Sequence, residues 1–592
     1  MGEQENQSSG FLLRLFPFLF WVSELRDPAV LRADLIAGLT VALVLIPQSM
    51  AYANLAGLPA YFGLYISFLP VIVAALWGSS RQLGTGPVAV VSLMTATAIT
   101  AVVGGTALDN PELAGQYIPL AMFMALLVGV FQLLLGLFRL GVVVNFLSHP
   151  VIVGFTNAAA LVIGLSQLSK IFGVEMPGSP NDSFITVRIW GVLQQVGDTH
   201  LPTLLMGLGA FMLMWLMKKH TPKLPGVLVA VVGTIILSFI LEFEEMGGMV
   251  VGEIPEGLPT MSMPVIDLEL LGTLLPSAII IAMVGFMEAI SIAKAMAAKT
   301  RHRIDPNQEL IGQGLGNIVG SFSQSYPASG SFSRSAVNLT AGAKTGFSSV
   351  VTGMIVLVTL LYLTPLLYHL PKAVLAAVIM MAVFGLINFA AVKHAWNTNK
   401  HDGIASVVTF FCTLGFAPHL DKGIMIGAGL ALGLYLYRTM KPRVALLGRY
   451  SDGTLRDLAM NSELVSDDEI VVLRFDGSLY FANVSYFEDT ILEVLSDKKD
   501  AKYILVVGDG INQLDASGEE VVRLLIPRLQ DNGITLVFSG LKRQILDIMR
   551  KSDLLDVLGN ENFFATEHMA LKDIYRRLGK SGDDAVLVRH MA

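Results

Sequence analysis

The stretches that decide the fold are Gly84-Thr85-Gly86-Pro87 and Tyr326-Pro327-Ala328-Ser329-Gly330-Ser331-Phe332-Ser333-Arg334. Each opens a short apolar run where a continuous membrane helix is expected. Glycine and proline there predict a helix that begins part-way through the bilayer, so its first N–H groups lack a partner in a preceding turn. Such donors are tolerated at membrane depth only beside a cavity, and a helix start is a natural anion site. Two interrupted segments in corresponding halves indicate the midplane binding site of a transporter.

The two stretches are expected to present backbone N–H groups to one point from opposite sides. The proline of the first stretch suits a first-turn position and leaves Val88 and Ala89 as donors. Phe332, Ser333 and Arg334 are expected to do the same in the second stretch. Facing helix N-termini concentrate positive partial charge, which favours an anion. The alternative is that both stretches are kinks in continuous helices, and the sequence does not exclude it.

The composition is that of a membrane protein with a charged tail. The 592 residues are 53% hydrophobic and 15% charged, with a mean hydropathy of +0.63, which is too apolar for an ordinary soluble protein. Apolar runs of about 20 residues, the length that spans a bilayer, continue to Tyr437, and charges return from Lys441 onward. The expected divisions are a cytoplasmic N-terminal segment at 1–33, a transmembrane domain at 34–440, a linker at 441–468 and a C-terminal domain at 469–592.

Several classes of protein and site are disfavoured. Cys412 is the only cysteine, so a single chain offers no disulfide or cysteine-based zinc site, and we expect it to be an unreactive lipid- or core-facing residue. The segment Met1–Arg32 lacks a basic n-region and a small-residue cleavage site, so no removable signal peptide is expected. There is no P-loop, metal cluster or nucleophile–base arrangement. We therefore predict no enzyme, catalytic residue, metal, cofactor or nucleic-acid partner, and a protein driven by ion gradients.

Fourteen candidate spans follow from the apolar runs, with boundary errors of several residues. They lie near 34–52, 61–78, 86–103, 115–138, 148–168, 201–218, 224–242, 271–298, 308–322, 331–342, 346–369, 372–391, 402–418 and 422–439. The stretch 183–197 is interrupted by an arginine and two glutamines and is expected to be an interfacial amphipathic helix.

Loop charges orient these spans. One side holds Arg81, 218–223, 294–303, Lys393, Lys400 and 438–443, which are all basic residues or runs that contain them. The other side holds Asp109, Glu112 and the acidic loop 242–270, which contains no lysine or arginine. By the positive-inside rule both termini are cytoplasmic, which favours an even number of spans.

The two halves match in spacing. The offset from Gly86 to Ser331 is 245 residues, and that from Gln48 to Glu288 is 240. Because seven spans is an odd number, the second half must insert upside down, which predicts a seven-plus-seven inverted repeat. This follows from topology more than from residue identity, which is weak between the halves.

The tail is predicted to be a small cytosolic α/β domain. Short apolar strands are expected at Glu469–Phe475, Tyr503–Gly508 and Ile534–Phe538. Helical patterns follow them near 484–497, 517–530 and 541–551, and alternation of this kind is typical of an α/β fold.

Several segments resemble the SulP anion permeases. They are Ala33-Asp-Leu-Ile-Ala-Gly-Leu-Thr-Val-Ala-Leu-Val-Leu-Ile-Pro47-Gln48-Ser-Met-Ala-Tyr52-Ala, Leu147-Ser-His-Pro150-Val-Ile-Val-Gly154-Phe-Thr, Asn317-Ile-Val-Gly-Ser-Phe and Ser333-Arg334-Ser335-Ala-Val-Asn338. Leu514-Asp515-Ala516-Ser517-Gly518 is similar to part of a STAS domain, the usual C-terminal partner in that family. The resemblance spans nearly the whole chain. It implies a uracil-permease-like architecture in which a core domain slides against a gate domain, and a homodimer.

The resemblance also implies a substrate pocket. It places Gln48 and Tyr52, which are four residues apart and share a helix face, in contact with substrate. It places Arg334 at the border of the pocket, where an arginine at membrane depth is costly and marks a functional site. Packing against a neighbouring helix remains the alternative for Gln48 and Tyr52. A structural ion pair, or reach to the aqueous boundary, remains the alternative for Arg334.

Glu288 is the candidate proton carrier. It lies in the apolar run Ile279–Ala293, and burial of a carboxyl favours its protonated form. The resemblance implies that a carboxylate here couples transport to a cation. Ser291 is the one oxygen ligand nearby and Ile292 supplies none, so protons are favoured over sodium. A structural contact with Lys294 or with backbone is the alternative.

Ser517 is a possible regulatory phosphorylation site, because the resemblance places it where bacterial STAS regulators are phosphorylated. The alternative is that Asp515 or Ser517 simply caps the following helix. The tail is also a candidate surface for a cytosolic partner.

The sequence thus predicts a secondary-active anion transporter of the cell inner (plasma) membrane. We expect proton-coupled uptake of sulfate or a related oxyanion or dicarboxylate by alternating access. The alternatives are a sodium-coupled bicarbonate transporter, a chloride or anion exchanger, an anion channel, and a STAS-linked membrane sensor. A channel has no need of a buried titratable group, so Glu288 favours transport.

Overall fold

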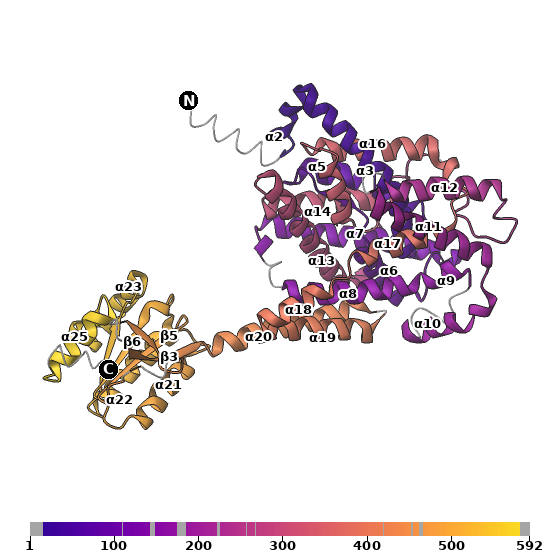
Figure 1. Cartoon of the computed structure of the whole chain (residues 1–592). Helices are drawn as coiled ribbons and strands as arrows, with labels where there is room; N and C mark the ends of the chain where they lie inside the picture. The colour runs from indigo at the N-terminus through magenta and orange to yellow at the C-terminus, as the bar shows by residue number, and fades with distance from the viewer. Residues whose placement is uncertain are drawn as a thin grey trace. The chain divides into compact units, whose positions relative to one another are not determined.

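The computed structural model describes residues 16–108, 110–142, 148–174, 185–221, 225–255, 257–266, 268–417, 419–450, 454–460, 464 and 466–580. The chain divides into two compact units, Met1–Ala431 and Leu432–Ala592 (Figure 1).

The first unit is helical apart from two short strands. Its first-half elements are α2 Leu19–Val22, α3 Pro28–Leu55, α4 Phe62–Ile66, α5 Leu69–Trp77, β1 Gly84–Gly86, α6 Ala89–Val103, α7 Ala114–Leu137, α8 His149–Ser166, α9 Leu168–Phe172, α10 Ile185–Gln194, α11 Leu201–His220 and α12 Gly226–Ile240. Its second-half elements are α13 Leu268–Thr300, α14 Pro306–Phe322, β2 Ser329–Ser331, α15 Phe332–Thr340, α16 Phe347–Val358, α17 Lys372–Phe384, α18 Phe389–Thr398, α19 Lys400–Phe416 and α20 Leu420–Met440, the last of which continues into the second unit.

Each of the fourteen predicted spans coincides with one helix or with two consecutive helices. Among the described residues, eight helical segments are long and apolar enough to cross a bilayer, and Phe62–Trp77, Ala89–Val103 and Gly226–Ile240 are shorter apolar helices. The helix expected near 183–197 is present as α10. Cys412 is a free, half-buried cysteine in α19.

Local sequence explains where the long helices begin. Asp27 caps α3 by accepting a hydrogen bond from the Ala29 N–H at 2.9 Å, and Pro28 occupies the first helical position. Asp305 caps α14 in the same way, accepting from the Asn307 N–H at 2.9 Å, with Pro306 in the first turn. Both arrangements satisfy donors that the helix itself leaves unpaired.

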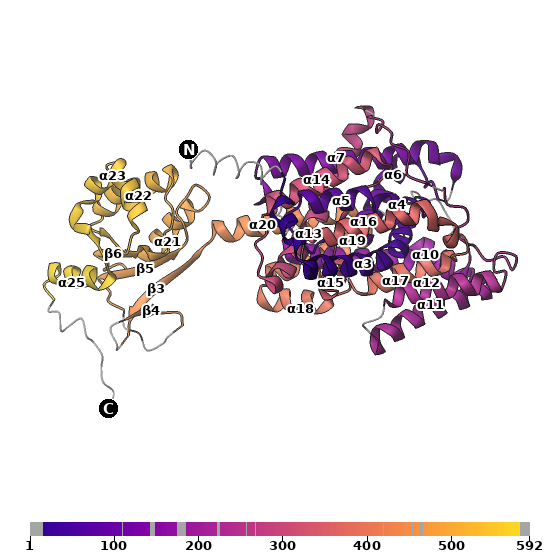
Figure 2. The same cartoon turned by 90° about the horizontal axis from the view of Figure 1, so that it is seen from above.

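Glycine permits close packing of α14, which lies beside α5 and α7 (Figure 2). A Cβ atom on Gly314 would lie 2.6 Å from the Leu133 nitrogen of α7, and one on Gly129 of α7 would lie 2.8 Å from the Gly314 carbonyl oxygen. Side chains at these positions would push the backbones apart. The tight contact matters because α14 leads directly into the loop before β2.

The second unit is built on a six-stranded sheet with strand order β4-β3-β5-β6-β7-β8. Strands β5 to β8 are parallel, whereas β3 pairs antiparallel with both β4 and β5. The elements are β3 Arg443–Arg449, β4 Leu455–Asp457, β5 Ile470–Asp476, α21 Val484–Asp497, β6 Tyr503–Val507, α22 Ala516–Gln530, β7 Thr535–Ser539, α23 Arg543–Lys551, α24 Leu554–Leu558, β8 Phe563–Phe564 and α25 Glu567–Arg577.

Both faces of this sheet are covered (Figure 2). Alternate residues such as Leu473 and Phe475 pack under α21 to α24, while Val472 faces the other way, towards α25. The α/β expectation for 469–592 holds, but the segment 441–468, expected to be a linker, contributes β3 and β4 to the sheet. The apolar runs in 441–468 are short and lie among charged residues. A prediction based on the change from apolar spans to a charged tail therefore missed these strands.

Candidate functional site

The two interrupted segments meet in the structure as a pair of antiparallel strands. Gly84 pairs with Ser331, Thr85 with Gly330 and Gly86 with Ser329. Two segments some 245 residues apart in sequence are thereby fixed in one register by backbone hydrogen bonds. The helices α6 and α15 start immediately after these strands, so the predicted interruptions are helix beginnings and not kinks in continuous helices.

Neither helix start is capped by a side chain. The N-cap of α6 is Val88, which has no side-chain acceptor, and the N-cap of α15 is Ser331, whose hydroxyl makes no cap hydrogen bond. The Ser331 hydroxyl lies instead 3.2 Å from that of Ser333. The first-turn N–H groups of both helices therefore stay available to an external acceptor, and an anion is the acceptor that the helix dipoles favour.

Arg334 lies against this strand pair and is fully buried, with 0% of its surface exposed. Its Nη1 donates to the Pro87 carbonyl oxygen at 2.9 Å, which ties α15 to the start of α6. Its Nε and Nη2 are buried without a hydrogen-bond partner. Among the described residues no acidic side chain forms an ion pair with Arg334. A buried cation with unsatisfied donors is costly, and a bound anion would satisfy it.

The glycines of β1 make room for the arginine. A Cβ atom on Gly84 would lie 2.9 Å from the Arg334 Cβ atom, and one on Gly86 would lie 3.3 Å from Arg334 Nη2. Gly86 also has a φ of 140°, a conformation that residues with a side chain rarely adopt. The strand can therefore lie flat under the guanidinium only because glycine stands at both positions.

Helix α3 supplies Gln48 and Tyr52, which are both buried. A Cβ atom on Gly86 would lie 3.6 Å from Leu45, which is one turn before Gln48, so this part of α3 packs on β1. The Gln48 Oε1 atom is buried without a partner. The predicted pocket face of α3 thus lies at the strand pair.

Glu288 lies on α13 beside β2. The Ser329 hydroxyl donates to the Gly285 carbonyl oxygen of α13 at 2.7 Å, and a Cβ atom on Gly330 would lie 2.9 Å from that of Ala289. Glu288 stands between these two contacts and is half-buried. Within the described residues it forms no ion pair, so the expected alternative of a bridge to Lys294 is not seen.

The remaining predicted residues differ in exposure. Val88 and Ala89 at the start of α6 are buried, whereas Phe332 is 60% exposed and Ser333 is also exposed. The α6 side of the strand pair is therefore enclosed by protein, and the first two residues of α15 face open space. Ser517 lies in the first turn of α22 and is half-buried.

The cap of α22 is Asp515, not Ser517. Its Oδ1 accepts from the Gly518 N–H at 2.8 Å, and its Oδ2 accepts from the Phe481 N–H at 2.9 Å. Of the two residues that could cap this helix, Asp515 therefore fills the role.

Four side chains that hold the strand pair in place received no role from the sequence. Asn317 of α14 accepts from the Ala328 N–H at 2.7 Å and donates to the Ala328 carbonyl at 3.2 Å, just before β2. The hydroxyl of the buried Tyr326 lies 3.4 Å from that of Ser92 in α6. A polar residue within an apolar span is the signal that could have identified both.

The other two are the buried carboxylates Asp34 and Glu309. Glu309 Oε2 accepts from the N–H groups of Ser79 and Ser80, both at 2.9 Å, in the loop before β1. Asp34 Oδ1 accepts from the Lys344 N–H at 2.7 Å in the loop after α15, and its Oδ2 accepts from a neighbouring threonine. Each carboxylate belongs to one half of the sequence and holds a loop of the other.

No metal centre is indicated among the residues that the structure describes, because no three histidine, cysteine, aspartate or glutamate side chains gather there. The arrangement offers anion recognition by helix starts and an arginine, with one carboxyl group beside it. It offers no nucleophile with an adjacent base.

The sequence matches two family models. Residues 31–409 match the sulfate permease family, and residues 461–570 match the STAS domain. The chloroplastic sulfate transporter 4.1 of Arabidopsis thaliana is 37% identical over 582 residues, covering 94% of this chain and 82% of that protein. The high affinity sulfate transporter 2 of Stylosanthes hamata is 31% identical, covering 95% of this chain and 87% of that protein.

Solved structures share the fold. The murine Solute Carrier 26 family member A9 anion transporter in its inward-facing state superimposes with a TM-score of 0.87 at 23% identity, covering 96% of this chain and 95% of the other. The transmembrane domain of a cyanobacterial bicarbonate transporter, BicA, gives a TM-score of 0.57 at 24% identity over 68% of this chain and 97% of the other. At these identities the likeness establishes the fold alone.

The predicted fold class is confirmed: a helical, multi-pass membrane transporter with a C-terminal STAS domain. The family consists of transporters, so the prediction that the chain is not an enzyme also holds. The fold, the uncapped helix starts and the two family matches agree, and the chain belongs to the sulfate permease family of anion transporters.

Proposed function

We propose that the protein imports sulfate, or a related oxyanion or dicarboxylate, by alternating access coupled to protons. The observation that carries the proposal is the β1–β2 pair, which sets two uncapped helix starts beside a buried arginine with unsatisfied donors. A tetrahedral or carboxylate anion has several acceptor oxygens and can accept from backbone and guanidinium donors together. The names of the relatives, which are sulfate transporters, support sulfate as the first substrate to test.

Seven residues form the proposed substrate site. The backbone of Val88 and Ala89, and of Phe332 and Ser333, donates to the anion, while Arg334 supplies a full positive charge. Gln48 and Tyr52 complete the site from α3, where the Gln48 Oε1 atom is buried without a partner and the amide group can donate its N–H groups to substrate.

Glu288 is the proposed proton site. It stands on the segment of α13 that is bonded to β2, so a change in its charge acts directly on the strand that positions Arg334. A protonated Glu288 removes a negative charge near the anion, and we propose that anion and proton therefore bind together. Release of the proton on the inner side then weakens anion binding there.

The test is uptake of radiolabelled sulfate into proteoliposomes with and without an inward proton gradient. Wild-type uptake is expected to increase as the outside becomes more acidic. The variant Glu288→Gln keeps size and hydrogen bonding but carries no titratable proton, so it should exchange sulfate without accumulating it. Glu269→Gln, at an exposed site on the same helix, is the control and should keep the pH dependence. Accumulation by Glu288→Gln with unaltered pH dependence would leave Glu288 as a structural residue.

Bicarbonate is the second candidate substrate, because the fold is shared with a bicarbonate transporter. A panel of sulfate, bicarbonate, chloride and dicarboxylates, each with a sodium or a proton gradient, separates proton-coupled import from sodium-coupled bicarbonate transport and from exchange. Conductance without coupling would indicate a channel, and binding without flux a sensor.

The wider proposal follows the family pattern. The transporter lies in the cell inner (plasma) membrane as a homodimer with both termini in the cytoplasm. The transport domain comprises 34–440 and is preceded by a cytoplasmic segment at 1–33. The STAS domain at 469–592 follows and is completed by β3 and β4 from the segment 441–468. The STAS domain binds a cytosolic partner, and phosphorylation of Ser517 regulates that contact.

A further inference from the structure

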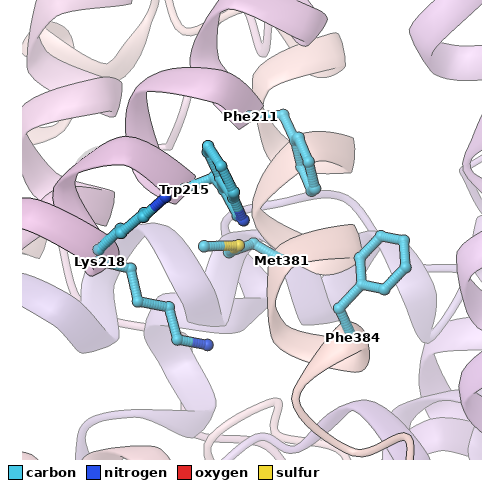
Figure 3. Close-up of a pocket in the computed structure, with 6 residues that line it drawn as sticks. Phe211, Trp215, Lys218, Met381 and Phe384 are labelled. Atoms are coloured by element: carbon cyan, nitrogen blue, oxygen red, sulfur yellow. The ribbon is translucent and has the colours of Figure 1, made fainter.

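A groove lies between the C-terminal halves of α11 and α17 (Figure 3). Its volume is about 430 Å³, and its walls are Phe211 and Trp215 of α11 and Met381 and Phe384 of α17. The rings of Phe211 and Phe384 are 5.8 Å apart and close one end. Phe384 and Trp215 are 55% and 44% exposed, so the groove is open on its outer side.

Two cations stand at the other end of this groove. Lys218 and Lys219 line it at the last turn of α11, and both are exposed. The Lys219 ammonium lies 5.4 Å from the centre of the Trp215 ring. In the part of the chain that the structure describes, neither ammonium pairs with a carboxylate.

The order of these residues along α11 matches the order of groups in a phospholipid. Phe211 lies seven residues before Lys218, which is a distance of about 10 Å along a helix. Apolar side chains therefore occupy the deeper part of the groove, tryptophan follows at the level where aromatic residues meet headgroups, and lysine stands at the end. A helix end alone would explain the lysines but not the apolar groove that leads to them.

We propose that this groove binds one anionic phospholipid, with an acyl chain along Phe211, Met381 and Phe384 and the phosphate on Lys218 and Lys219. A zwitterionic lipid fits the groove but gains less from the lysines, because its own cation offsets its phosphate. Each lysine near an anionic lipid surface contributes about fivefold in binding, so the pair is expected to give a preference on the order of 20-fold.

We expect the bound lipid to affect transport through its contact with α17. This helix packs on α11, on α8 and on α3, which carries the proposed substrate residues. A lipid that bridges α11 and α17 therefore stabilises one position of a helix adjoining the site.

The test uses Trp215 as the reporter in the full-length protein. Brominated phosphatidylglycerol or brominated phosphatidylcholine is titrated into phosphatidylcholine vesicles, and the Trp215 signal is the quenching in wild type minus that in Trp215→Phe. We expect half-maximal quenching at a much lower fraction of the anionic lipid. The double variant Lys218→Gln/Lys219→Gln should remove that preference and still be quenched.

The control is Lys393→Gln/Lys400→Gln, which removes the same charge from two exposed lysines outside the groove and should keep the preference. Equal quenching by the two lipids in wild type, or equal loss of preference in both double variants, overturns the proposal. Absence of Trp215 quenching by either lipid, with crosslinking between copies through Phe384→Cys in a Cys412→Ser background, would make the groove a protein interface and also overturn it.

Discussion

Arg334 is held by geometry, not by an opposite charge. One N–H bond to the Pro87 carbonyl and two flanking glycines of β1 fix its position, while two of its three nitrogen atoms stay unpaired. An unpaired buried cation destabilises the protein unless a ligand satisfies it, which is why an anion site is proposed here.

Removal of that charge tests the residue directly. Arg334→Ala is expected to weaken anion binding about 10- to 100-fold, the range of a charged hydrogen bond, while weak binding persists through the helix starts. The affinity of Arg334→Lys for the anion should lie between that of the wild type and that of Arg334→Ala, because lysine keeps the charge but not the planar guanidinium. Affinity for sulfate, measured by isothermal titration at low salt, gives the comparison, and an unchanged value for Arg334→Ala places the residue outside the site.

Glu309 is expected to act on binding through the loop before β1. Glu309→Ala leaves the buried N–H group of Ser80 without an acceptor, which costs about 1–3 kcal/mol, and the half-buried N–H group of Ser79 without one at a smaller cost. Glu309→Gln still offers one oxygen and should lose less. Thermal unfolding and sulfate affinity are measured together, and both are expected to fall in Glu309→Ala. Normal stability and affinity in that variant would show that the loop is held by other contacts.

At the scale of elements, the strand pair β1–β2 does what neither half-helix could do alone. A helix shorter than the bilayer makes few contacts with its neighbours. The hydrogen bonds between β1 and β2, the strands that precede α6 and α15, align these two helices. In the second unit, strand pairing again joins two separate segments. The β3 strand covers the edge of β5 and buries Ala445 and Leu447.

A pair of fragments tests the β3 strand. A fragment of residues 441–592 contains β3 and should unfold cooperatively as a monomer. A fragment of residues 469–592 exposes the β5 edge and loses the burial of Ala445 and Leu447, so we expect it to be less stable by about 3 kcal/mol or more, or to aggregate. Urea unfolding followed by circular dichroism decides this, and equal stability of the two fragments would mean that β3 is dispensable.

At the scale of the whole molecule, the loop charges predict an orientation in the membrane that a pair of cysteine variants can check. Met263 in the acidic loop and Glu520 in the STAS domain are both exposed, and each is replaced by cysteine in a Cys412→Ser background. Membrane-impermeant maleimide should label Met263→Cys only from outside and Glu520→Cys only from the cytoplasmic side. Labelling of both from the same side contradicts the fourteen-span topology.

The sequence by itself determined the fold class and the two helix starts that meet at the proposed anion site. Apolar runs indicate membrane spans because the residues of a span are buried in lipid, and glycine with proline indicates an interruption because both disfavour a continuous helix. Gln48, Glu288 and Arg334 could be identified for a related reason, since polar groups within apolar runs are costly and need an explanation.

Only the tertiary structure decided which of these groups remain unpaired and what holds them. The register of β1 on β2, the bond from Arg334 to Pro87, and the loops held by Asp34 and Glu309 all join residues more than 200 positions apart. β3 escaped notice because its apolar residues lie among charges, and its partner β5 lies beyond an intervening segment. Local sequence patterns show which residues require burial or a hydrogen-bond partner. Which partner each residue obtains depends on how distant segments pack.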